Sequence, residues 1–162
     1  ITKLWFSNTY FNLYNNHYVG DIPKTTIAAD GSSTTVFEPF NARATSYTAN
    51  MTHQFTLPRK YSVELSGWYL SPFIEGQLAG NPMGAVSFGI QKKMMNDKAS
   101  VKLNINDIFW TQRFNGAFLF NDINVQLRNK WESRVVRINF SYRFGNSKIA
   151  GARQRNTGLE DE

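Results

Sequence analysis

The feature that most constrains this chain is an alternation of apolar and polar residues with a period of two. Between Ser46 and Leu57 every second residue is polar, and the residues between them are Tyr47, Ala49, Met51, His53, Phe55 and Leu57. The same alternation recurs in Tyr61–Tyr69, Ala85–Lys93, Ser100–Asn106 and Val136–Phe144. Successive side chains of a β-strand point to opposite faces, so each segment predicts a strand with one apolar and one polar face.

The length of these segments suits strands that cross a membrane. Most of them have about nine residues or more, which a tilted membrane strand requires and which exceeds the usual strand of about 5–6. A helix that spans a membrane needs about 20 mostly apolar residues, whereas the longest uninterrupted apolar run here is Ala117–Phe120. Ile1–Tyr14 also predicts a strand, but its aromatic residues fall on both faces and leave its apolar side unassigned.

The connections between the predicted strands alternate between short and long. Pro58–Lys60 and Asn96–Lys98 predict tight turns, whereas Asn15–Asn41, Ser71–Gly84 and a segment that begins at Thr111 predict long loops. Short turns on one side and long loops on the other are typical of bacterial outer-membrane barrels, in which the short turns face the periplasm. We therefore expect an all-β, transmembrane, antiparallel up-and-down barrel segment with six strands, three long external loops and a periplasmic C-terminus.

Two parts of the chain are harder to interpret. Within Thr111–Ser133 the last two strands could continue as a ribbon above the membrane, or an extra small hairpin could form, with Gly116 as one point where a strand would break. After Phe144 the alternation stops and the chain becomes polar and charged. We expect residues 1–145 to form the barrel segment and residues 146–162 to form a flexible periplasmic tail.

The last predicted strand has the clearest assignment of faces. An arginine on the lipid side would cost about 2–4 kcal/mol at the midplane of the membrane, so the basic residues of this strand are expected to point into the lumen. The predicted lipid-facing residues are Val136, Ile138, Phe140, Tyr142 and Phe144. The predicted lumen-facing residues are Arg137, Asn139, Ser141 and Arg143.

The composition argues against several classes of function. Cysteine is absent, which removes disulfides and thiolate chemistry, and His17 and His53 do not have the spacing of metal ligands. The net charge of +6 comes from scattered lysines and arginines, which does not favour nucleic-acid binding. We expect no enzyme activity, no cofactor and no metal, and we expect contact with outer-membrane lipid.

Aromatic residues suggest two uses. One group occurs near the ends of the predicted strands; it comprises Tyr61, Trp68, Tyr69, Trp110, Tyr142 and Phe144. Because amphipathic rings favour the headgroup region of a membrane, we interpret this group as an aromatic girdle rather than as rings that stack on a ligand. A second group lies in the predicted loops, where it could contact a ligand or a partner or could pack loop against loop; it comprises Phe37, Phe40, Phe114, Phe118 and Phe120.

Two segments resemble a known family. Asp97–Phe109, which ends in Asp107, Ile108 and Phe109, resembles the penultimate strand of TonB-dependent receptors, and Arg134–Phe144 resembles their final strand with its terminal aromatic residue. Ala152–Glu162 is similar to the tail of the TonB-dependent-receptor-like branch that is common in Bacteroidetes. The resemblance implies a barrel of about 22 strands with an N-terminal plug, of which this chain would form the last six strands.

Six strands are too few to form a closed membrane barrel, because the smallest bacterial barrels have eight. Unpaired backbone groups at an open edge in hydrocarbon cost several kcal/mol each, so the missing strands and the plug are expected upstream in the same protein, or in another chain. The sequence begins at Ile1 with no signal peptide, which fits a start partway through a longer protein or after processing. Expected partners are TonB, a surface lipoprotein or other barrels.

Three functions remain in competition. The first is energy-coupled uptake of a bulky nutrient such as a siderophore, glycan or peptide. The second is a structural or assembly role as a barrel subunit of a larger outer-membrane complex without transport activity of its own. The third and weakest is a soluble carrier of lipocalin type.

Overall fold

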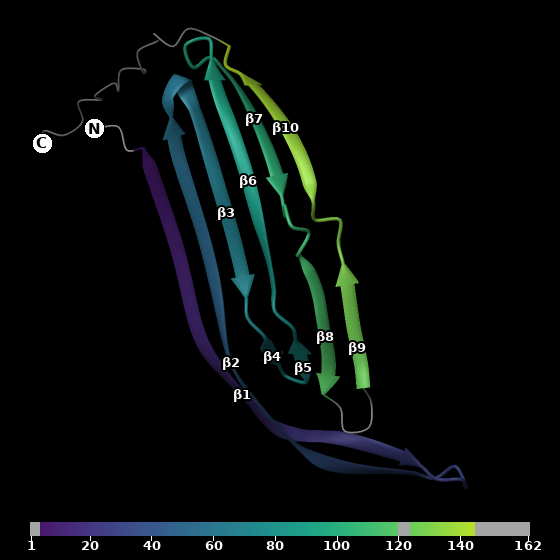
Figure 1. The fold of residues 1–162 in the computed structure, drawn as a ribbon. Coiled ribbons are helices and arrows are strands. Elements are labelled where there is room, and N and C mark those ends of the chain that lie inside the picture. Colours follow the sequence, from purple (N-terminus) through teal and green to yellow (C-terminus); the bar gives the residue numbers. More distant parts are fainter. Residues whose placement is uncertain (1–3, 120–123, 145–162) are drawn as a thin grey trace, which may run out of the picture.

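The computed structural model describes residues 4–119 and 124–144, and the predicted tail at residues 146–162 lies outside them. The described residues form β-strands and one short 3-10 helix, and they contain no helix long and apolar enough to cross a membrane. Most strands belong to a six-stranded sheet in the order β1-β2-β3-β6-β7-β10 (Figure 1). Its strands are β1 (Trp5–Ile27), β2 (Ser33–Leu57), β3 (Tyr61–Leu70), β6 (Met83–Met94), β7 (Ala99–Asn106) and β10 (Val135–Tyr142).

Every neighbouring pair in this sheet is antiparallel. The all-β, antiparallel architecture predicted from the alternation is therefore confirmed. In the described part of the chain the sheet is not closed, and β1 and β10 form its two edges. The figure of about 22 strands stays a prediction.

Both short connections are tight turns at one end of the sheet. The 3-10 helix η1 (Pro58–Lys60) joins β2 to β3, with a φ of 58° at Arg59. The second turn joins β6 to β7 and places Asn96 and Asp97 at φ values of 53° and 68°. Asn and Asp tolerate this left-handed region better than most residues because their short polar side chains bond to nearby backbone groups.

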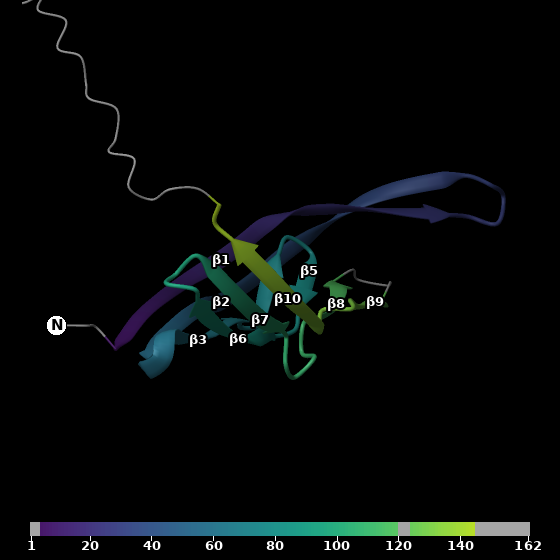
Figure 2. The same cartoon turned by 90° about the horizontal axis from the view of Figure 1, so that it is seen from above.

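The prediction of a long loop at Asn15–Asn41 was wrong. β1 and β2 instead continue as a paired ribbon that extends far beyond the other strands and bends away from them (Figures 1 and 2). Lys24 Nζ and Glu38 Oε1 lie 3.2 Å apart across this ribbon. Pro23 and Pro39 suggested a loop, but a two-stranded ribbon gives each strand an outer edge, and proline is tolerated in edge strands.

The other two predicted loops contribute a second, four-stranded sheet. Its order is β4-β5-β8-β9, and its strands are β4 (Phe73–Glu75), β5 (Leu78–Gly80), β8 (Arg113–Leu119) and β9 (Asn124–Lys130). β8 and β9 form the extra hairpin that was one of two alternatives for Thr111–Ser133. Gly116 does not break a strand but lies inside β8, where a Cβ atom would approach the Ala79 carbonyl oxygen to 2.8 Å. Close approach of two backbones, rather than a turn, therefore requires this glycine.

Candidate membrane surface and the junction at Asp107

The register of the six-stranded sheet places the alternating apolar residues of all its strands on one face. Residues that pair across antiparallel strands share a face, and one such row runs from His53 through Leu65, Phe88 and Ile105 to Val136. We call this side the apolar face. Between residues 47 and 142 it carries the odd-numbered residues of β2, β3 and β7 and the even-numbered residues of β6 and β10.

The register also resolves the orientation of β1. Trp5 pairs with Phe55, and Phe11 with Ala49, so these two rings and Leu13 lie on the apolar face. Phe6, Tyr10 and Tyr14 lie on the opposite face. The sequence could not decide between these sides because aromatic residues occupy both.

The apolar face is exposed in the described part of the chain. Val136, Ile138 and Phe140 of β10 keep 60%, 74% and 67% of their surface exposed. An apolar patch that runs across six strands is far larger than a soluble monomer ordinarily exposes. This face therefore has the character of a surface that is covered by lipid.

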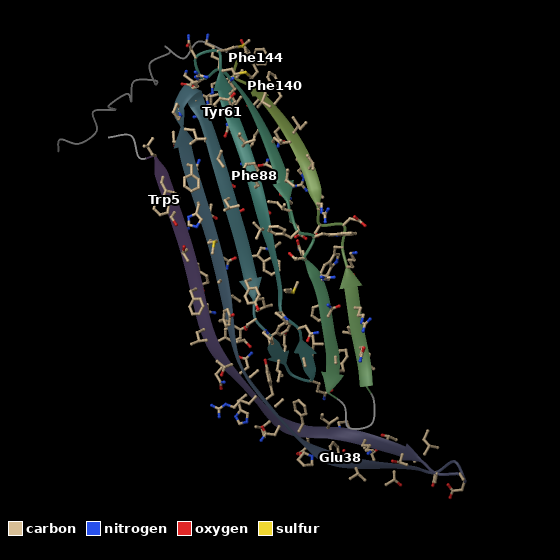
Figure 3. All side chains as sticks on the ribbon, viewed as in Figure 1. Trp5, Glu38, Tyr61, Phe88, Phe140 and Phe144 are labelled. Atoms are coloured by element: carbon tan, nitrogen blue, oxygen red, sulfur yellow. The ribbon has the colours of Figure 1, made fainter. Side chains whose placement is uncertain are left out.

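Aromatic side chains gather at two levels of the apolar face. Near the short turns, Trp5 and Phe55 stack with ring centroids 6.3 Å apart, and Tyr142 meets Phe144 edge to face at 4.6 Å. Figure 3 shows Tyr61, Phe140 and Phe144 at this end of the sheet. At the other level, which lies farther from the short turns and which we call the upper aromatic level, the rings of Phe11 and Tyr69 flank Tyr47 at 5.7 and 5.6 Å.

The distance between these two levels is close to the height of the apolar band of a membrane barrel. At about 3.3 Å per residue, the strand between Tyr47 and Phe55 is about 26 Å long, which at a tilt of about 40° gives roughly 20 Å along the membrane normal. Barrels carry an apolar band about 25 Å tall between two aromatic girdles. The Tyr61, Tyr69 and Tyr142 rings lie at these two levels, whereas Trp68 pairs with Ala85 on the opposite, polar face.

The polar face of the sheet carries the residues predicted to face the lumen. Arg137, Asn139 and Ser141 alternate with the apolar residues of β10 and share this face with Asn104, Lys102 and Ser100 of β7. On the same face Lys102 Nζ lies 3.7 Å from Glu64 Oε2 of β3. Arg143 follows the end of β10, and its backbone N–H donates to the Lys98 carbonyl oxygen. That one face meets lipid and the other a lumen remains a prediction for all of these residues.

The motif Asp107-Ile108-Phe109 forms a junction between the two sheets. Asp107, directly after β7, is 1% exposed and has a φ of 45°. Its Oδ1 atom accepts a hydrogen bond from the backbone N–H of Thr111, and its Oδ2 atom accepts from the backbone N–H of Gln112 and the hydroxyl of Ser133. The Thr111 hydroxyl lies 3.2 Å from Oδ1 but donates its one hydrogen to the closer Gly84 carbonyl oxygen at 2.8 Å. One carboxylate thus fastens the start of β8 and the link between β9 and β10 to the end of β7.

The protonation state of Asp107 follows from these contacts. Burial alone would raise the pKa of the carboxyl, but the hydrogen bonds from Ser133, Gln112 and Thr111 outweigh it and hold the pKa below its usual value. The carboxylate is therefore ionised at neutral pH and accepts the hydrogen bonds from Thr111, Gln112 and Ser133. Ile108 also belongs to the junction, because its N–H donates to the Val86 carbonyl oxygen, whereas Phe109 is 67% exposed.

The Trp110 ring contacts two cationic side chains beside this junction. Lys130 Nζ lies 3.4 Å and the Arg134 guanidinium carbon 5.2 Å from the centroid of its ring, a cation–π geometry. Its indole N–H donates to the Trp131 carbonyl oxygen. Trp110, which the sequence predicts to lie in an aromatic girdle, thus connects the link between β7 and β8 to the end of β9 and the link between β9 and β10.

The two histidines lie far apart in the fold. His17 Nε2 is 3.0 Å from Asn41 Oδ1 in the β1–β2 ribbon, and the His53 ring lies beside both the Trp5 ring and the Phe55 ring on the apolar face. In the described residues no three His, Asp or Glu side chains are close enough to share a metal ion.

Sequence reasoning missed the residues that cooperate with Asp107 and a group of cations above the apolar face. Arg113 pairs with Lys130, and Asn115 with Arg128, across β8 and β9. The alternation of Gln126, Arg128 and Lys130 in β9 was a signal of a polar strand face. The register with β8 was needed to bring Arg113 to the same face.

An open antiparallel sheet with one apolar face, two aromatic levels and a polar opposite face defines a wall of a membrane β-barrel. Residues 1–142 match the model of the outer membrane protein beta-barrel family, and the chain belongs to this family. The family places the protein in the outer membrane. Neither the comparison with curated proteins nor that with solved structures gave a match.

Proposed function

We propose that this chain forms the closing wall of a larger, TonB-dependent receptor-like barrel that imports a bulky nutrient such as a siderophore, glycan or peptide. The observation that carries the proposal is the combination of a continuous apolar face with two unpaired edge strands, β1 and β10, in the described residues. An open edge in hydrocarbon leaves backbone groups unsatisfied. Further strands of the same protein or of another chain therefore close the wall, and the polar face lines a lumen.

Two features support a receptor rather than a small barrel. Asp97–Phe109 and Arg134–Phe144 resemble the last two strands of TonB-dependent receptors, and these strands pair with each other as β7 and β10. At the end opposite the short turns, the β1–β2 ribbon and the four-stranded sheet form a large structured region (Figure 1). We assign this region to the cell exterior, where receptors capture substrate, and the C-terminus to the periplasm.

The test is uptake by cells that produce the complete protein. Labelled siderophore, glycan and peptide pools are offered with and without a protonophore, and cells that lack the protein serve as the control. We expect accumulation of one pool that requires both the protein and the proton-motive force. Accumulation that a protonophore leaves unchanged would refute energy coupling.

One observation favours a second role as a subunit of a larger outer-membrane complex. The projecting β1–β2 ribbon exposes Val19, Ile27 and Phe37 at 71%, 74% and 66%, an apolar surface that suits contact with a partner. A photoreactive amino acid in place of Phe37 tests this role in intact cells, with the same group at Asp30 in the exposed turn as a control. Crosslinks to another barrel or a lipoprotein that form only from position 37 would support the structural role, and crosslinks confined to the chain itself would exclude it.

A further inference from the structure

A groove of about 540 Å³ lies on the apolar face beside the upper aromatic level. Its lining is mostly apolar and includes Ala49, Met51, Gly67, Tyr69, Val86 and Phe109. Gly67 belongs to the floor because it pairs with Met51 on one side and Val86 on the other, and it has no side chain to fill the space between them. The groove is thus a channel in a surface that otherwise carries large side chains.

A cationic hollow of about 700 Å³ continues from this groove. Arg113 and Asn115 line both spaces, and Arg128 and Lys130 line only the second. None of the described residues that line either space is acidic. No carboxylate of the described residues forms an ion pair with Arg113 or Arg128.

The two spaces have a defined order along the sheet. The groove spans positions next to Tyr69 at the upper aromatic level, and the cationic hollow lies on β8 and β9, beyond the end of β7. Passing from one to the other therefore leads from the lipid level into the headgroup level of a membrane. Arg113 lies at the boundary between the groove and the hollow.

We propose that the groove and the hollow together bind one lipid, whose acyl chain lies along Gly67 and whose phosphate-bearing headgroup contacts Arg113, Arg128 and Lys130. The inference rests on the proposed orientation, so this lipid belongs to the outer leaflet. Charge complementarity selects the occupant. Three cations in a hollow with no acidic residue among its described lining attract an anionic headgroup, and the adjoining apolar groove accepts a hydrocarbon chain. A zwitterionic lipid offers the same chain but a headgroup without net charge.

Native mass spectrometry of the complete protein in detergent tests the site, with dimyristoyl phosphatidylglycerol and dimyristoyl phosphatidylcholine as probes. We expect the wild-type protein to retain the anionic probe preferentially. Arg113→Gln should weaken its binding about fivefold, in line with one cation at a membrane surface, while leaving the zwitterionic probe unaffected. Arg137→Gln removes the same charge from the polar face and should leave both probes unaffected.

The groove is tested separately at Gly67. A Cβ atom there would meet only ordinary contacts, the nearest being the Ala85 carbonyl oxygen at 3.5 Å, so Gly67→Ala is a control that keeps the fold. Gly67→Leu should fill the channel and weaken both probes about tenfold. Wild-type affinity in both Gly67→Leu and Arg113→Gln, or equal retention of the two probes by the wild type, would overturn the proposal.

A membrane-insertion assay distinguishes failure of the lipid-site proposal from failure of the proposed function. Flotation of each variant with phosphatidylcholine vesicles and its heat-modifiable migration on gels show whether a barrel has formed. A wild-type protein that does not insert contradicts the barrel itself and with it the lipid site. An inserted wild-type protein without selective lipid binding contradicts the lipid site alone.

Discussion

Asp107→Asn is the substitution whose consequence the structure specifies best. Asn is close to Asp in size and, like Asp, tolerates the φ of 45° at this position. It replaces one carboxylate oxygen with an amide NH₂ group, which cannot accept a hydrogen bond. One backbone N–H, that of Thr111 or that of Gln112, then loses its acceptor, and the remaining hydrogen bonds to residue 107 no longer involve a charged group.

The expected cost of this change is about 3 kcal/mol. A hydrogen bond to a charged group contributes about 1.5–3 kcal/mol. At a site that is 1% exposed, one such bond disappears, its N–H donor is left buried without an acceptor, and the remaining bonds are weakened. The loss acts on local opening of the junction, where the backbone N–H groups of Thr111 and Gln112 bond to the carboxylate. About 3 kcal/mol corresponds to roughly a hundredfold faster exchange of these amide hydrogens.

Hydrogen–deuterium exchange of the complete protein in nanodiscs measures this effect. Peptides that cover residues 107–114 should exchange faster in Asp107→Asn, while peptides from the centre of β3 keep their wild-type rates. The matched control is Asp30→Asn, which changes a carboxylate that also accepts hydrogen bonds but lies in an exposed turn. Equal exchange at residues 107–114 in wild type and Asp107→Asn would refute the claim that this carboxylate holds the junction.

The other predictions concern pH, the two faces and one glycine. Because the Asp107 pKa is lower when folded than the usual value of about 3.9, its contribution is fully present above that value and is lost as pH falls through the folded pKa. Amide hydrogen exchange at residues 107–114, corrected for its intrinsic dependence on pH, should become faster only below about pH 4. In Asp107→Asn the corrected exchange rate should not change with pH. Ile138→Arg should lower the free energy of unfolding of the vesicle-inserted protein by about 2–4 kcal/mol, measured by urea titration. Asn139→Arg, one position away on the polar face, should change this free energy little. Equal losses in the two variants would contradict the assigned faces. Gly116→Ala should loosen β5 and cost about 1–3 kcal/mol, seen as faster proteolysis there, whereas Gly20→Ala, with open space around its Cβ, should not.

Much of the membrane wall could be predicted from sequence because its signal is local. The alternation in segments such as Ser46–Leu57 and Val136–Phe144 reports directly which residues face the same way. The loops were predicted less well, since Pro23, Pro39 and Gly116 are breakers in isolation. In the folded chain, pairing with a second strand gives hydrogen-bond partners to the backbone groups of the neighbouring residues, so these three residues can lie within strands.

The candidate sites depended on contacts that no local pattern contains. Asp107 and Ser133 are far apart in sequence, and a hydrogen bond between them exists only because β7 and β10 pair. The same holds for Arg113 and Lys130, which meet through the β8–β9 hairpin. The resemblance to receptor strands drew attention to Asp107, but it did not indicate what the carboxylate binds.

The sequence by itself determined the class of this protein: strands of membrane length, one apolar side on most of them, and no helix that could replace them. These properties follow from the two-residue period of a strand, which is a property of the backbone alone. Tertiary structure decided which sides coincide, because only the hydrogen-bonded register aligns Trp5, His53, Phe88 and Val136 on one face. It also built the junction at Asp107 and joined the apolar groove to Arg113, since each depends on residues that pairing brings together across the sheet.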